Sequence, residues 1–358
     1  MARVGVGLVS LSLCALAVGL AACAAKNAGA GYTDDDGGNG GPGGDVDGGV
    51  GNGGDGTPGF GNEAGEAAPQ DGDIVVTTTI YANTDDSLYS MDPKTRAVTL
   101  IGKFSGADGN VTDVAVNGAG DVYVNTEATI YKAALPATPG TVALTKVATI
   151  AAKKTGQQFF ALAFAPAGVL GPNESLVGGD GDGELWWIDT GNGATKDLGS
   201  FGTDPKSPTK RVLALSGDLV FYNDATNKPT GLATIRSCPD TTGACDKTSD
   251  YLAGIDMAAL SAAYTSGTPA KSLLGGIYGG SGSNPGTGTG SGEVFGLGAW
   301  EGDVYGFTRG TAPSLILIDT GTGAGNKQPG SFSFTNGWSG AGVTTKVTIN
   351  VPPPPPVK

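Results

Sequence analysis

Residues 178–187, with the sequence GGDGDGELWW, carry three carboxylates at alternate positions: Asp180, Asp182 and Glu184. Oxygen ligands with this spacing suit calcium, so these side chains are the candidate metal ligands of the chain. A complete twelve-residue calcium loop is absent, because Leu-Trp-Trp stands where the later ligands would fall. Asp-Gly is also the commonest turn signal of β-hairpins, which favours a tight hairpin without metal. No other cofactor is expected.

Two cysteines are the second set of residues with candidate chemistry. Cys238 and Cys245 bracket the short segment PDTTGA. Nearby cysteines of an exported protein usually pair, so we predict a disulfide between them. A metal or redox role has little support, since the spacing is not Cys-x-x-Cys and no histidine could complete a metal site.

Histidine is absent from all 358 residues. This absence excludes Ser-His-Asp and Cys-His nucleophile systems and every imidazole metal site, but leaves enzymes built on carboxylates or tyrosine open. The chain carries 21 basic and 34 acidic residues, which argues against nucleic acid as a partner. No set of residues forms a recognisable catalytic constellation, so no catalytic residue is predicted.

The N-terminus resembles an export signal. A basic start at Arg3 precedes an apolar, uncharged run over residues 4–20, and Leu20-Ala21-Ala22-Cys23 follows. This junction resembles the bacterial lipobox, which implies cleavage before Cys23 and acylation of that cysteine. Two or three acyl chains anchor a protein stably to a membrane. The alternative is an ordinary signal peptide in which Cys23 has no role. Ala24, where an aspartate is absent, is consistent with transfer to an outer membrane.

Low-complexity segments flank the folded part. Residues 23–73 form a Gly- and Asp-rich tether that cannot bury enough apolar surface to fold. About 50 such residues span roughly 35–40 Å as a coil. Residues 351–358, VPPPPPVK, are a Pro-rich tail with polyproline II character, expected to lie outside the fold.

Residues 74–350 repeat a short β pattern. Four apolar runs end in an aspartate and a turn, at Asp92, Asp189, Asp256 and Asp319. Asp, Pro and Gly after a strand are explained by turn chemistry, so we expect these aspartates to be structural. Strands of the type GDVYVN precede them, and runs such as VTDVAVN and FFALAFA precede those. In the fourth unit the corresponding segments are RVLALSG from Arg211 and SGDLVFYND from Ser216.

Four strands per unit predict an all-β fold, a β-propeller of five four-stranded blades. The first unit lacks its inner strand, and residues 337–349 contain one additional strand. We therefore predict that this C-terminal strand pairs with the first blade as its inner strand and so closes the ring. Residues 223–249 form an insertion in the fourth unit; if the insertion were itself a blade, the count would be six. One helix is suggested, over residues 257–264.

The repeats resemble those of secreted bacterial β-propellers with the pattern LYxIDPxTGxxTLIG. With the lipobox and the tether, the whole chain resembles predicted lipoproteins common in myxobacteria. This resemblance implies a monomeric, lipid-anchored propeller at the outer membrane, on its periplasmic or outer side. We expect it to bind an envelope protein or a glycan without catalysis. The alternatives are a polysaccharide-active enzyme with paired carboxylates, and a purely structural surface protein.

Overall fold

The computed structural model describes residues 79–355, except 206, 208, 210, 240–244, 246–247, 280–287, 311, 331, 333 and 335. Cys23, the export signal, the whole of the tether, residues 74–78 and the last three residues lie outside the described residues. Among the residues that are described, no helix has the length and apolar character needed to cross a membrane.

In the part of the chain that the structure describes, twenty strands form five antiparallel groups of four, and each group is a blade. From the inner strand outward, blade one holds β20 (Gly340–Gly342), β1 (Ile80–Asn83), β2 (Ser87–Met91) and β3 (Val98–Ser105). Blade two holds β4 (Asp113–Val116), β5 (Val122–Asn125), β6 (Thr129–Ala134) and β7 (Gly140–Thr149). Blade three holds β8 (Phe159–Ala165), β9 (Ser175–Asp180), β10 (Glu184–Ile188) and β11 (Thr195–Ser200).

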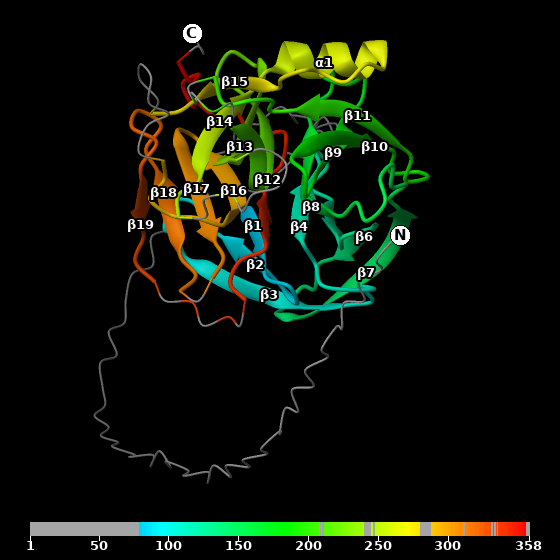
Figure 1. The fold of residues 1–358 in the computed structure, drawn as a ribbon. Helices are drawn as coiled ribbons and strands as arrows, with labels where there is room; N and C mark the ends of the chain where they lie inside the picture. Colours follow the sequence, from blue (N-terminus) through cyan, green and yellow to red (C-terminus); the bar gives the residue numbers. More distant parts are fainter. Residues whose placement is uncertain are drawn as a thin grey trace, which may run out of the picture. The chain divides into compact units, whose positions relative to one another are not determined.

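Blade four holds β12 (Val212–Asn223), β13 (Pro229–Cys238), β14 (Tyr251–Ile255) and β15 (Leu274–Ile277). Blade five holds β16 (Val294–Trp300), β17 (Asp303–Thr308), β18 (Leu315–Ile318) and β19 (Gly325–Lys327). Each inner strand contacts the inner strands of the next and previous blades, which closes a ring (Figure 1). The predicted five-bladed β-propeller is therefore confirmed.

The C-terminal strand completes the first blade, as predicted. β20 pairs antiparallel with β1, with Tyr81 opposite Gly342 and Asn83 opposite Gly340. The outer strands of blades one and two add a parallel pairing, β3 with β7, so these two blades share one eight-stranded sheet. Each inner strand is the edge of its sheet, and closure of the ring places that edge among the other blades at the centre.

Blade four corrects one strand assignment. The segments from Arg211 and Ser216 were predicted as two strands, but both belong to the single inner strand β12. A bulge between Leu215 and Leu219 interrupts its pairing with β13, and Gly217-Asp218 lies in that bulge rather than in a turn. The insertion supplies the missing second strand, β13, so the blade count remains five.

The chain after β20 closes the far end of the central axis. Val347 and Ile349 are buried, and Thr344 pairs with Val116 at the C-terminal end of β4. Thr348 pairs with Asn223 at the end of β12, and the Asn350 N–H donates to the backbone carbonyl of Glu301 in blade five. The Pro-rich tail was expected outside the fold, but Val351 is buried and Pro354 lies against blade four.

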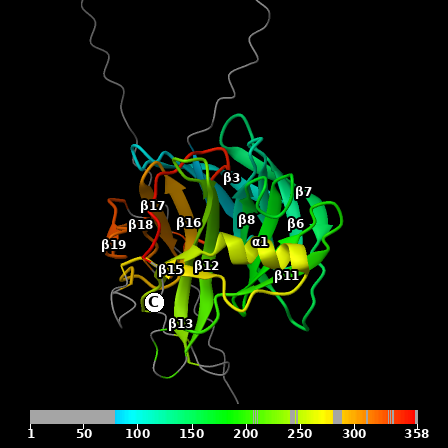
Figure 2. The same ribbon diagram turned by 90° about the horizontal axis from the view of Figure 1, so that it is seen from above.

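The turn aspartates have the predicted structural roles. The Asp92, Asp189 and Asp319 carboxylates each accept N–H groups two or three residues ahead, at 2.7–3.2 Å. Asp256 instead caps the helix α1 (Met257–Ser266) by accepting the Ala258 and Ala259 N–H groups at 3.0 Å. α1 lies across blade three beside β11 (Figure 2), where Tyr264 packs against Trp187.

Candidate functional site

A cavity of about 460 Å³ lies at the N-terminal ends of the inner strands, the end opposite the C-terminal closing segment. All five blades contribute to its wall, through the starts of inner strands and the loops between second and third strands. We call it the central cavity. Its lining includes Asp85, Thr112, Glu127, Phe160, Asp180, Ser216, Arg236, Cys245, Phe295, Arg309 and Ser339. A mid-sized concavity where many elements converge is the usual place for a ligand.

One ion pair shapes the rim between blades one and five. Both Arg309 Nη atoms donate to the two carboxylate oxygens of Asp85, at 3.0 and 3.2 Å. Ser339 and Asn336 donate to the same carboxylate. Partial burial opposes ionisation of Asp85, but these hydrogen bonds outweigh it and hold the pKa of the carboxyl below its ordinary value. The Arg309 guanidinium also lies 5.6 Å from the centre of the Phe295 ring.

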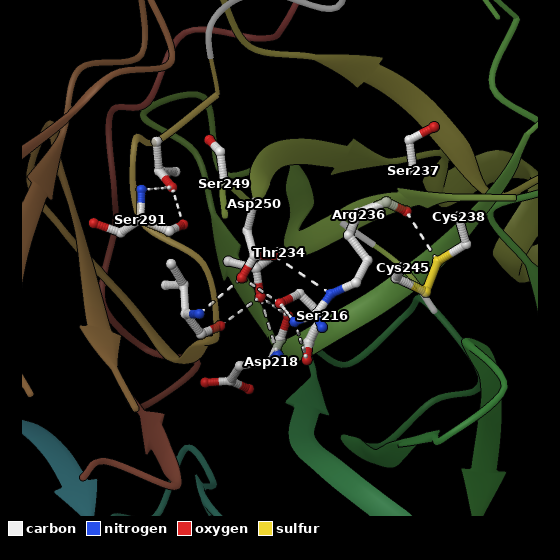
Figure 3. A network of polar contacts seen from close by, with 12 residues as sticks. Ser216, Asp218, Thr234, Arg236, Ser237, Cys238, Cys245, Ser249, Asp250 and Ser291 are labelled. Carbon is white, nitrogen blue, oxygen red and sulfur yellow. Dashed lines mark hydrogen bonds and ion pairs between the residues drawn. A yellow bond between two sulfur atoms is a disulfide. The ribbon is translucent and has the colours of Figure 1, made fainter. Parts of the chain in front are cut away.

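A buried polar network forms the blade-four wall (Figure 3). Arg236 donates to the Ser216 carbonyl at 3.2 Å and to its hydroxyl, and that hydroxyl donates to Asp250. Arg236 Nε lies 3.4 Å from Asp250 Oδ1, while Asp250 Oδ2 accepts the Val294 N–H at 2.8 Å. Burial raises the pKa of Asp250, although the Arg236 charge opposes the rise. Arg236 is thus neutralised by a carboxylate of its own blade.

Two smaller cavities adjoin the central one. The first, about 250 Å³, shares Phe160, Asp180 and Gly181 with it and is lined by the loop of residues 154–158. The second, about 380 Å³, shares Asn110 and Glu127. Both smaller cavities border the central cavity on the side of blades two and three. Phe160 stands between two of them and is 36% exposed, one of three large apolar side chains this exposed among the described residues.

The candidate calcium ligands do not come together. Asp180 is buried, and it accepts hydrogen bonds from Gln157, the Trp186 indole and two backbone N–H groups. The Lys154 ammonium pairs with both Asp182 and Glu184. Among the residues with described positions, no three acidic or cysteine side chains are grouped to hold a metal. The hairpin interpretation of this segment fits the structure, and the calcium hypothesis does not.

The predicted disulfide is present, because Cys238 and Cys245 are bonded. It joins the end of β13 to the loop before β14, and Cys245 lines the central cavity (Figure 3). The disulfide therefore fixes part of the cavity wall.

The structure also contains a pair of neighbouring carboxyl groups that was not predicted from the sequence. Asp113 on β4 and Asp218 on β12 are both fully buried, and their carboxyl groups are in hydrogen-bonding contact. Glycosidases need two carboxyl groups about 5–10 Å apart with the sugar between them, so this pair does not have that arrangement. The signal that could have revealed it is an aspartate inside two strands otherwise made of apolar residues.

The four tryptophans are mainly packing residues. Trp186, Trp300 and Trp338 are buried, and Trp187 is half-buried beside Tyr264. Trp338 packs edge-on against Tyr89, Phe307 and Phe334 at the seam where the ring closes. None of the four lines the central cavity, so the aromatic contribution to the cavity comes from Phe160 and Phe295.

No known protein family matches the chain, and no curated protein sequence is similar to it. Similar solved structures include a protein of unknown function from Bacteroides caccae, at 12% identity and a TM-score of 0.38, covering 74% of this chain and 97% of that one. Another, of unknown function from Bacteroides thetaiotaomicron, has 15% identity and a TM-score of 0.39, and the alignment covers 78% of this chain and 61% of that one. The WD40 β-propeller domain of Doa1 has 10% identity and a TM-score of 0.33, covering 73% and 81%. These values are too low to inform ligand or activity, so the fold assignment rests on the strand pairing.

Proposed function

We propose that this protein is an exported, lipid-anchored β-propeller that binds a neutral oligosaccharide in the central cavity, without catalysis. The observation that supports this ligand is the central cavity, which is lined by all five blades and has two smaller cavities directly beside it. A row of adjacent cavities suits a chain of several small units better than a single compact molecule.

The chemistry of the wall favours a sugar. Phe160 offers an exposed ring between two cavities, on which the C–H face of a sugar ring would pack. Carboxylate, amide and hydroxyl groups surround it, at Asp180, Gln157 and Gln158 among others. A few placed polar groups around apolar surface are the usual means of fixing a ligand's orientation.

The charge of the wall favours an uncharged ligand. Both arginines are paired, Arg309 with Asp85 and Arg236 with Asp250. The remaining charged residues of the lining are Glu127 and Asp180, and both are acidic. Anionic sugars would meet net negative charge here, because like charges disfavour association.

An array of oligosaccharides tests the ligand class. Fluorescently labelled protein lacking the lipid, as the Cys23→Ala variant, would be applied to neutral, amino and acidic oligosaccharides of two to eight units. We expect binding to neutral chains that strengthens with length, and none to uronic-acid chains. Preferential binding to acidic chains, or no binding to any chain, would contradict the proposal.

The anchor is proposed from the sequence of residues 20–23 and is tested separately. Mass spectrometry of the mature protein should find an acylated N-terminal Cys23, and the Cys23→Ala variant should leave the membrane fraction. An unmodified wild-type N-terminus would remove the anchor from the proposal and leave the ligand untouched.

A further inference from the structure

Among the described residues, the five inner strands at the centre of the propeller carry two carboxyl groups and no positive charge. The inner strands β8, β16 and β20 carry no charged residue, and β4 and β12 carry one each, Asp113 and Asp218. Both side chains are fully buried and touch each other. Next to the pair, Arg236 on β13 and its partner Asp250 bond to Ser216, two residues before Asp218.

The pair connects all five blades through backbone N–H groups. Asp113 of blade two accepts the N–H of Leu162 in blade three at 2.5 Å. Asp218 of blade four accepts the N–H of Leu297 in blade five at 2.5 Å and that of Ala341 in blade one at 3.3 Å. Each aspartate also accepts the N–H of the residue that follows it, at 2.7 and 2.6 Å. Contact between the two carboxyl groups joins these halves into one network.

Two touching carboxylates without a cation cannot both be ionised in a buried site, since like charges at this range repel strongly. We propose that Asp113 and Asp218 hold one proton between them, and that this shared proton makes the pair a pH-dependent latch joining the inner strands of all five blades. The proton lies between the carboxyl groups, because the remaining lone pairs accept backbone N–H groups.

The direction of the pH dependence follows from the burial. Burial raises the pKa of both carboxyl groups, and the neighbouring Asp218 raises that of Asp113 further. A free aspartate in the unfolded chain loses its proton near pH 4. The folded protein therefore holds one proton more than the unfolded chain above that pH. The latch is fully effective below about pH 4 and is lost as the pH rises through the raised pKa of the pair.

The absence of histidine makes this effect measurable, because few other groups titrate between pH 5 and 8. Among the other described carboxyl groups, Asp250 is also raised by burial and contributes in the same direction, while those with lowered pKa values, such as Asp319, are ionised throughout this range. The pair should shift the unfolding equilibrium by up to about tenfold per pH unit within the window.

Two measurements on the intact protein test the latch. Denaturant unfolding between pH 5 and 8 should show wild-type stability falling as the pH rises, with a clearly smaller slope for Asp113→Asn. The asparagine amide donates permanently to Asp218, so it replaces the titrating proton. Asp113→Asn should also be less stable overall, because one N–H acceptor is lost. The control Asp319→Asn, an exposed turn aspartate, should keep the wild-type slope.

Infrared difference spectra give the second readout and keep the test valid if the Asp113→Asn variant does not fold. Wild type and Asp319→Asn should show a protonated carboxyl band at pH 7 that disappears as the protein is titrated to higher pH. Asp113→Asn or Asp218→Asn, whichever folds, should lack most of it. Wild-type stability that is flat or rises from pH 5 to 8, or a band unchanged in both variants, would overturn the proposal.

Discussion

Arg309 and Asp85 lie 224 residues apart in the sequence and meet at the rim of the central cavity, where two parallel hydrogen bonds join them. Asp85 lies between β1 and β2 of blade one, and Arg309 follows β17 of blade five. The pair therefore bridges the two blades that the C-terminal strand brings together, and it fixes the opening of the cavity. Its side chains are only 27% and 15% exposed, so solvent screening is limited.

Arg309→Ala should lower the free energy of unfolding by about 1–3 kcal/mol at pH 7, because it leaves a half-buried carboxylate without its charged donor. Denaturant unfolding measures this loss. The matched control is Lys103→Ala, whose partner Asp86 is as exposed as the lysine itself, with an expected loss below about 0.5 kcal/mol. Equal losses in the two variants would contradict the role given to Arg309.

The pH dependence of the Arg309→Ala effect has a definite sign. The pKa of Asp85 is lowered in the folded protein, so the contribution of the pair is present above the unfolded pKa and is lost as the pH falls through the folded value. The difference between wild type and Arg309→Ala should therefore shrink below about pH 4. A difference that grows on acidification would mean that the carboxylate is not stabilised by this arginine.

Gly340→Ala should destabilise the protein at the closure of the ring. A Cβ at this position would lie 2.0 Å from Asp113 Oδ1 and 2.6 Å from the Asp113 Cα, so backbone as well as side chain would have to move. Overpacking of this kind costs about 1–3 kcal/mol, and disruption of the Asp113 hydrogen bonds would add to it. Thermal unfolding measures the loss. Gly140→Ala is the control, since its Cβ meets nothing nearer than 3.5 Å, and it should be close to neutral.

Reduction of the Cys238–Cys245 disulfide should destabilise the protein by about 2–3 kcal/mol, because the seven-residue separation closes a short loop. Unfolding with and without a reducing agent measures this. The double variant Cys238→Ser/Cys245→Ser should match the reduced wild type and be insensitive to the reductant. A wild type that is indifferent to reductant would show that the bond adds nothing.

Local sequence patterns predicted the architecture well, for a physical reason. Aspartate followed by Pro or Gly marks strand ends through its own side-chain hydrogen bond, and Asp92, Asp189 and Asp319 form that bond. Strand count and ring closure followed from the repeat. A different signal misled in blade four: the Gly-Asp pair that opens the second strand of other units, here Gly217-Asp218, lies in a bulge, because β12 continues through it and the insertion supplies β13. A Gly-Asp pair can stand in a turn or in a bulge, and only the pairing of the neighbouring strands distinguishes the two.

The site was much less predictable than the fold. The central cavity is lined by residues from Asp85 to Ser339, single positions in loops and strand starts that share no motif. The Asp113–Asp218 contact joins residues 105 positions apart, and neither residue shows from its own segment that the other is near. Such sites depend on how blades face one another, which local periodicity does not encode.

Isothermal titration of Phe160→Ala tests the central claim, that a neutral oligosaccharide binds in the central cavity. The probe is the longest neutral oligosaccharide bound on the array, titrated into wild type, Phe160→Ala and Leu100→Ala. Leu100 is 42% exposed on β3 and lies outside the lining of the cavity, which makes it the matched control. Covering the exposed part of the Phe160 ring should contribute roughly 0.5–1.5 kcal/mol, so its loss should weaken binding about two- to twelvefold. Leu100→Ala should bind as wild type does. Unchanged affinity in Phe160→Ala, or equal weakening in both variants, would contradict the account.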